Sequence, residues 1–71
     1  MDRPQIETQE YFDYMTVLIG LFEQALPVEV YGFSYYSTVA FHWKMPDGKT
    51  SSTYATIPFV TFEMIAKGVQ K

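Results

Sequence analysis

Few residues of this chain have the types and spacing that catalysis or metal binding requires. His42 is the only histidine and there is no cysteine, so a transition-metal site, which takes several nitrogen and sulfur ligands, is not indicated. A general base also needs a nucleophile or an orienting carboxylate beside it. The nearest acid in sequence is Asp47, which a turn explains better. We therefore interpret His42 as a structural or partner-contacting residue.

The other polar residues give no stronger catalytic signal. Glu7, Glu10 and Asp13 fall on one side of an expected helix, where a run of charge usually serves solvation. The serines lack the context of a nucleophile elbow, and the four glycines form no phosphate-binding loop. The sequence thus predicts a protein without enzymatic activity and without a cofactor or metal.

Apolar periodicity defines the elements that must position these side chains. Residues 6–26 carry apolar side chains at three- and four-residue steps, which is typical of an amphipathic helix. Asp2 or Thr8 is the expected N-cap, with Pro4 in the first turn, and Pro27 marks the end. The expected buried face of this helix consists of Tyr11, Phe12, Met15, Leu18, Ile19, Phe22 and Leu26.

Three strands are expected next, at residues 28–36, 38–45 and 50–57. Alternation of apolar and polar residues is clean in the second of them. The first has bulky residues on both faces, so its buried face stays open. A tight turn is expected at Ser37 and Thr38, and residues 46–49, PDGK, have the composition of a turn that closes an antiparallel hairpin.

Pro58 begins a last helix that runs to about residue 69, with Glu63 and Lys67 one turn apart as an ion pair. The order predicts a single α+β domain over residues 1–71: an N-terminal helix, a three-stranded antiparallel sheet and a C-terminal helix, α-β-β-β-α. Both helices should pack on one face of the sheet. The expected core comprises Phe12, Ile19, Phe22, Phe41, Trp43, Phe62 and Ile65.

The charge of the chain argues against several functions. Five basic and eight acidic residues give a net charge of −3, which disfavours binding to nucleic-acid phosphates. Double-stranded RNA-binding domains share this element order, but they place lysines at the start of the last helix. Here the first basic residue of that helix is Lys67. No apolar run is long enough to span a membrane or has signal-peptide flanks, so we expect a cytoplasmic protein.

Two candidate contact surfaces remain. One is a flank of the first helix, where apolar residues at i, i+3 and i+7 adjoin acidic ones; it is either the edge of the core, a dimer seam or a partner seam. The other is the open face of the sheet, rich in tyrosine. The candidate residues are Glu10, Asp13, Tyr14, Val17 and Leu21 on the helix, and Tyr31, Tyr35, Tyr36 and His42 on the sheet.

These features lead to a main hypothesis of a small, acidic protein-binding module whose partner is a basic protein. By analogy, its size and composition suit a phage or mobile-element protein, or a bacterial accessory protein, that inhibits a host nucleic-acid-handling complex. One alternative is a single-stranded nucleic-acid binder that stacks bases on the tyrosines of the sheet. A second alternative is a homodimeric structural subunit.

Overall fold

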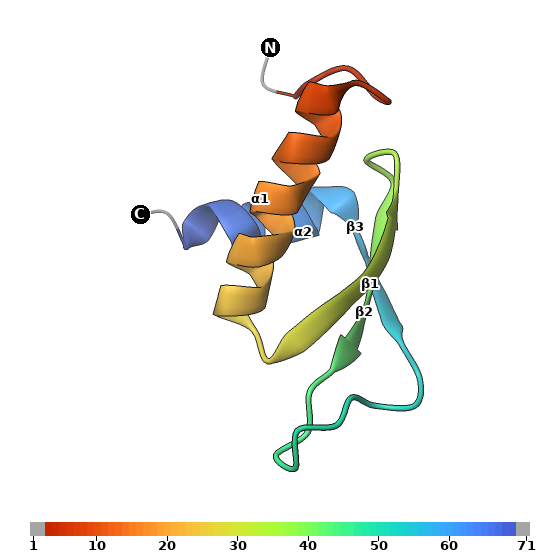
Figure 1. Ribbon diagram of the computed structural model, residues 1–71, viewed down its shortest axis with the longest axis vertical. Helices are drawn as coiled ribbons and strands as arrows, with labels where there is room; N and C mark the ends of the chain where they lie inside the picture. Colours follow the sequence, from red (N-terminus) through yellow and green to blue (C-terminus); the bar gives the residue numbers. More distant parts are fainter. Residues whose placement is uncertain (1–2, 70–71) are drawn as a thin grey trace.

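The computed structural model describes residues 3–69, and it confirms the predicted α-β-β-β-α order (Figure 1). Helix α1 spans Gln9–Ala25, and α2 spans Phe59–Gly68. The strands are β1 (Val28–Ser34), β2 (Thr38–Trp43) and β3 (Ala55–Pro58). They form one antiparallel sheet in the order β1-β2-β3.

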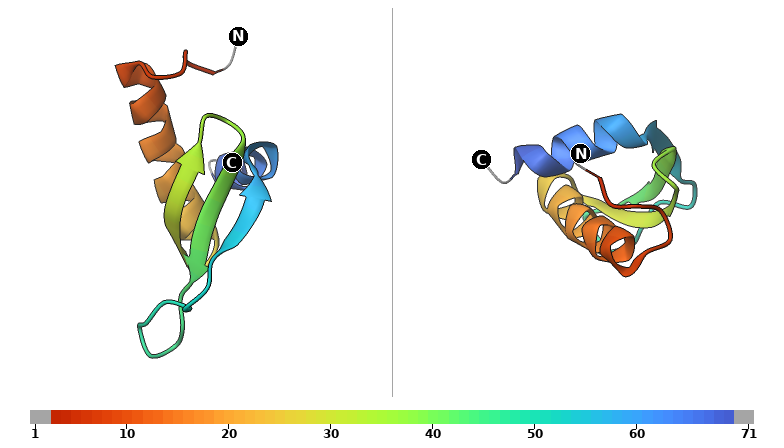
Figure 2. Two further views of the ribbon diagram at one scale, coloured as in Figure 1. Left: turned by 90° about the vertical axis from the view of Figure 1, so that its right-hand side faces the viewer. Right: turned by 90° about the horizontal axis from the view of Figure 1, so that it is seen from above.

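Both helices lie on the same face of the sheet and leave the opposite face open (Figure 2). The core lies between the helices and the sheet. Its buried members are Tyr11, Met15, Leu18 and Phe22 of α1, Phe59, Phe62 and Ala66 of α2, and Val28, Val39 and Phe41 of the sheet. Phe22, Phe41 and Phe62 were expected in this core, whereas Ile19 and Ile65 are only half-buried at its edge.

Two expected core residues, Phe12 and Trp43, are instead about half exposed, at 49% and 46%. Helix α1 turns Tyr11 to the sheet, and Phe12, one residue further around the helix, lies outside the core with its ring nearly perpendicular to that of Tyr11. Trp43 is the last residue of β2, at the opposite end from Thr38, which pairs with Pro58 just before α2 begins. Helix α2 therefore covers the other end of the strand.

The beginning of α1 is set by Thr8, one of the two expected caps. Its hydroxyl oxygen accepts a hydrogen bond from the Tyr11 backbone N–H at 3.1 Å. The predicted start at residue 6 was too early, because Glu7 has a φ of 66°, in the left-handed region that a right-handed helix cannot use. Glu7 and Pro4 therefore lie outside the helix. Asp2 lies outside the described residues.

A β-bulge at Tyr31 resolves the ambiguous faces of β1. Val30 pairs with Phe41 and Gly32 pairs with Ala40, so Tyr31 is the extra residue between them. The bulge resets the alternation of side chains. As a result Val30 before it and Phe33 after it both pack against the core, while Tyr31 is 65% exposed.

The turn after β1 differs from the expected one at Ser37 and Thr38. Thr38 pairs with Ser34, and the Ser37 N–H donates to the Ser34 carbonyl at 2.6 Å. Tyr35 and Tyr36 form the turn with φ values of 37° and 64°. The predicted first strand, residues 28–36, was thus two residues too long.

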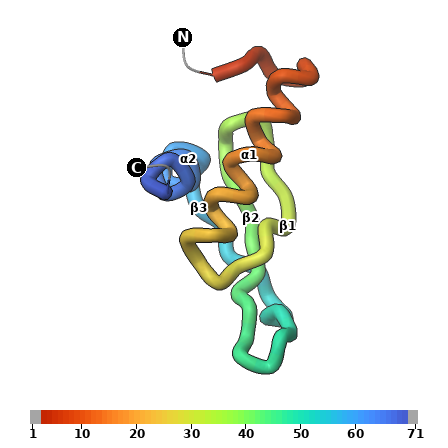
Figure 3. Tube along the Cα trace, turned by 60° about the vertical axis from the view of Figure 1, so that its left-hand side comes forward, coloured from red at the N-terminus to blue at the C-terminus, as the bar shows by residue number. Residues whose placement is uncertain are grey.

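The connection between β2 and β3 projects away from the helices (Figure 3). Its tip confirms the turn predicted from PDGK: Gly48 has a φ of 89°, and an Asp47 carboxylate oxygen accepts from the Lys49 N–H at 3.0 Å. The third strand begins at Ala55, later than predicted. Ser51 explains the delay, because its hydroxyl takes the place of a ladder carbonyl and accepts from the Trp43 N–H at 3.1 Å.

The outer edge of β1 is closed at one point by α1. A Glu23 carboxylate oxygen accepts a hydrogen bond from the Val30 backbone N–H at 2.8 Å. An unpaired strand edge is a template for pairing with another chain, and a side chain that occupies its N–H groups hinders such pairing.

Candidate functional site

A groove of about 400 Å³ runs beside α1, between the N-terminal segment and the end of α2. The residues that line it are Pro4, Glu10, Asp13, Tyr14, Val17, Leu18 and Lys67. Four of the five residues predicted on the helix flank therefore meet in one hollow. The fifth, Leu21, is not in the lining and is half-buried against the core.

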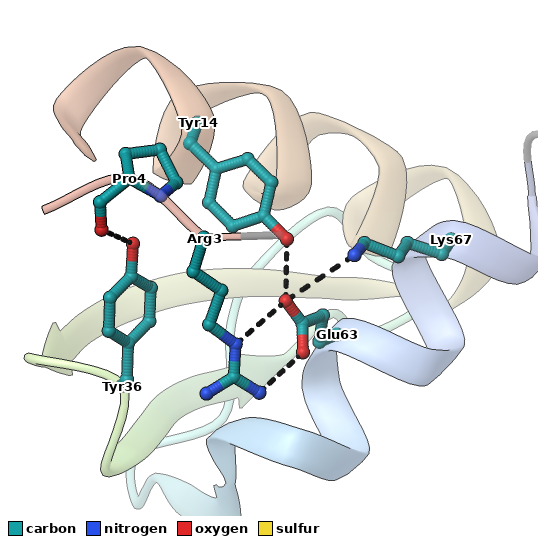
Figure 4. A network of polar contacts seen from close by, with 6 residues as sticks. All are labelled: Arg3, Pro4, Tyr14, Tyr36, Glu63 and Lys67. Carbon is teal, nitrogen blue, oxygen red and sulfur yellow. Dashed lines mark hydrogen bonds and ion pairs between the residues drawn. The ribbon is translucent and has the colours of Figure 1, made fainter. Parts of the chain in front are cut away.

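Two residues that line the groove, Tyr14 and Lys67, belong to a polar network centred on Glu63 of α2 (Figure 4). Arg3 donates from Nη2 to Oε1 at 2.6 Å and from Nε to Oε2 at 3.2 Å. The Tyr14 hydroxyl donates to Oε2 at 2.5 Å, and Lys67 Nζ lies 3.5 Å from the same oxygen. The network thus joins α1, α2 and the N-terminal segment.

The network also fixes Pro4 at the rim of the groove. The Tyr36 hydroxyl donates to the Pro4 carbonyl at 2.9 Å, and the Arg3 guanidinium lies over the Tyr36 ring at 5.2 Å and the Phe59 ring at 5.1 Å. Residues 3 and 4 are therefore held by specific contacts to α2 and to the turn after β1. Tyr36, predicted on the open sheet face, is instead half-buried on the helix side, edge-on to Phe59.

The electrostatics of the network keep Glu63 ionised. The hydrogen bonds from Arg3, and then the one from Tyr14, hold the pKa of Glu63 at about 2, although burial opposes the shift. Burial and the bond to Glu63 raise the pKa of the Tyr14 hydroxyl. A hydrogen bond that the Lys67 ammonium donates to the Tyr14 hydroxyl oxygen, with the Glu63 charge nearby, raises the pKa of Lys67. Tyr14 is therefore a neutral donor and Lys67 a cation at neutral pH.

The rim of the groove on α1 is acidic. Glu10 and Asp13 lie one helical turn apart, and α1 contains no basic residue. Asp13 accepts a hydrogen bond from the neutral Gln9 amide at 2.9 Å. Within residues 3–69, neither carboxylate forms an ion pair. In the described part of the chain, this rim therefore carries two carboxylates that have no paired cation.

The open face of the sheet carries a small aromatic cluster. The Tyr31 and Tyr54 rings are stacked with centroids 5.3 Å apart, and His42 meets Tyr31 edge-on at 5.2 Å. His42 Nδ1 lies 3.0 Å from the Ser51 carbonyl oxygen. A hollow of about 260 Å³ beside the tyrosines includes Gly32 and Ala40 in its lining.

The structure thus brings together only two of the four residues predicted on this face, Tyr31 and His42. Tyr35 lies in the turn after β1 and stacks on Tyr11, with ring centroids 6.2 Å apart. The sequence did not indicate Tyr54 as a member of this cluster. Tyr54 stands just before β3 in a Ser/Thr-rich stretch whose pattern indicates only an exposed strand. Arg3 was missed because nothing in the sequence relates it to Glu63.

Comparisons with protein families, with curated proteins and with solved structures gave no match to this chain. Over residues 3–69, no helix has the length and apolar character that a membrane span needs. The same part of the chain holds no group of three acidic, histidine or cysteine side chains arranged for a metal ion.

Proposed function

We propose that this protein is a small, non-enzymatic protein-binding module whose partner docks in the groove beside α1. The observation that carries the proposal is the convergence of Glu10, Asp13, Tyr14 and Val17 on one hollow of about 400 Å³. Val17 is 55% exposed there, and a partner that covers it would remove apolar surface from water.

The groove is also held in shape before any partner arrives. The Tyr14 hydroxyl is held by its hydrogen bond to Glu63, and the Pro4 carbonyl is held by its hydrogen bond from Tyr36. A preformed surface loses less conformational entropy on binding than one that must be ordered, and this favours affinity. A phage or bacterial accessory protein that acts on a host nucleic-acid-handling complex in the cytoplasm is the setting we propose, by analogy alone.

The test compares tagged wild type with Val17→Arg and the matched control Thr16→Arg. Thr16 is exposed on the same helix but does not line the groove. Each protein is incubated with a nuclease-treated bacterial lysate, and retained proteins are quantified by mass spectrometry. We expect one stoichiometric partner with wild type and Thr16→Arg that is lost with Val17→Arg. Equal retention by all three folded proteins would place the binding surface elsewhere.

The stacked Tyr31–Tyr54 pair supports a second candidate, a binder of single-stranded nucleic acid, because exposed aromatic rings can stack bases. The charges nearby argue against this function, because Glu29 pairs with His42 in the register and the nearest basic residue along the chain is Lys44, just after β2. A fluorescence titration with labelled single-stranded oligonucleotides at low salt tests this second candidate. Absence of binding there excludes the candidate, since low salt favours phosphate contacts most.

The homodimer stays a third proposal, and the ten large apolar side chains exposed among residues 3–69 are the feature that favours it. Light scattering over a concentration series tests it. A mass that stays at 8.2 kDa through the micromolar range would exclude a structural dimer.

A further inference from the structure

We infer that the groove beside α1 binds a basic segment of its partner, in which an apolar side chain is flanked by lysine or arginine. This inference rests on the proposed function and names the partner's chemistry. Its basis is the distribution of charge around the groove.

The acidic rim on α1 offers the contact for the basic residues. Glu10 and Asp13 are exposed, lie on one side of the groove and have no ion pair within the described residues. An incoming lysine or arginine would meet two carboxylates one turn apart, without having to displace a cation already bound there. The same two carboxylates would repel an acidic segment.

Lys67, the cation that lines the groove, does not neutralise this rim. Its ammonium lies 3.5 Å from Glu63 and 5.5 Å from the centre of the Tyr14 ring. It is thereby held on the α2 side. The groove is consequently polarised, acidic along α1 and basic along α2, so the basic residues of the segment should lie toward α1.

The apolar lining of the groove is the reason to expect an apolar side chain in the partner segment. Val17, Leu18, the Tyr14 ring and Pro4 form most of the remaining surface, and a volume of about 400 Å³ has room for one or two apolar side chains. A short linear segment fits this size better than a broad domain surface. Apolar contact would supply affinity, and the carboxylates would select the sign of the flanking charge.

The experiment selects binders from a random peptide library displayed on phage, with wild-type protein as bait. We expect enriched peptides that combine a bulky apolar residue with neighbouring lysine or arginine. The best one, synthesised with a fluorophore, is titrated against wild type, Glu10→Gln/Asp13→Asn and the control Glu7→Gln/Glu29→Gln. The control makes the same change in net charge at exposed acids outside the groove.

We expect the Glu10→Gln/Asp13→Asn variant to bind about three- to tenfold more weakly, and the control to bind like wild type. Peptides that lack basic residues, or equal binding by the two charge variants, would overturn this inference. If such peptides nevertheless lose binding with Val17→Arg, the proposed groove itself stands. Binding that Val17→Arg leaves unchanged, or no enrichment at all, would overturn both.

Discussion

Arg3 and Glu63 form a two-point contact although sixty positions separate them in the chain, with N–O distances of 2.6 and 3.2 Å. Glu63 is only 9% exposed, and a carboxylate removed from water needs partners for its charge. Arg3, Tyr14 and Lys67 supply them. The contact therefore joins the N-terminal segment to α2, next to Tyr14 and Lys67, which line the candidate groove.

Glu63→Gln should lower the free energy of unfolding by about 1–3 kcal/mol. The amide keeps the shape of the side chain but removes the negative charge that faces Arg3 and Lys67. Glu10→Gln, an exposed acid without an ion pair in the described part of the chain, is the control and should change stability by less than about 0.5 kcal/mol. Urea denaturation measures both, and equal effects would contradict the prediction.

The stability of the protein should fall between about pH 4.5 and pH 2 because of Glu63. The pKa of Glu63 is about 2 in the folded protein, against an ordinary value of 4.5 that applies to the unfolded chain. The folded state therefore binds the proton less readily than the unfolded chain. The resulting stabilisation is complete above pH 4.5 and is lost as the pH falls through 2. We expect a contribution of about 2 kcal/mol, after allowance for solvent around the half-exposed Arg3.

The midpoint of urea denaturation is measured from pH 2 to pH 6 for wild type and for Glu63→Gln. The difference in midpoint between the two proteins at each pH reports this contribution. That difference should narrow on acidification. A constant difference would mean that the Glu63 carboxylate titrates alike in the folded and unfolded states.

Tyr14→Phe should lower the stability of the protein, whereas Tyr11→Phe should not. Tyr14 loses a hydrogen bond to a charged acceptor, so we expect a loss of about 1–2 kcal/mol. The Tyr11 hydroxyl is buried with no hydrogen bond in the described residues, so its removal should leave stability unchanged or raise it by up to about 1 kcal/mol. Thermal or urea unfolding of the two variants tests the pair, and a larger loss for Tyr11→Phe would refute the assignment.

Tyr35→Asn should be more stable than Tyr35→Ala by roughly 1 kcal/mol. Both changes remove the ring that stacks on Tyr11, but the backbone keeps a φ of 37°, which asparagine tolerates better than alanine. The comparison isolates the backbone strain of the turn after β1. Equal unfolding free energies would show that the turn relaxes in the variants.

The sequence by itself determined the order of elements and the signals that act within a few residues. Thr8 caps α1, Pro27 follows its end, and the turn at Gly48 forms as its composition predicts. Of the expected helix face, Tyr11, Met15, Leu18 and Phe22 are fully buried. Such features depend on backbone sterics, local hydrogen bonds and periodicity, which neighbouring residues specify.

Only the tertiary structure decided which side chains meet across the fold. The bulge at Tyr31 depends on the register between β1 and β2, and one extra residue decides whether Phe33 faces the core or the solvent. The exposure of Phe12 depends on the rotation of α1 against the sheet. The Arg3–Glu63 contact requires the packed helices to bring the two ends of the chain together. Register, helix rotation and long-range ion pairs arise from packing between distant segments, and no local pattern encodes them.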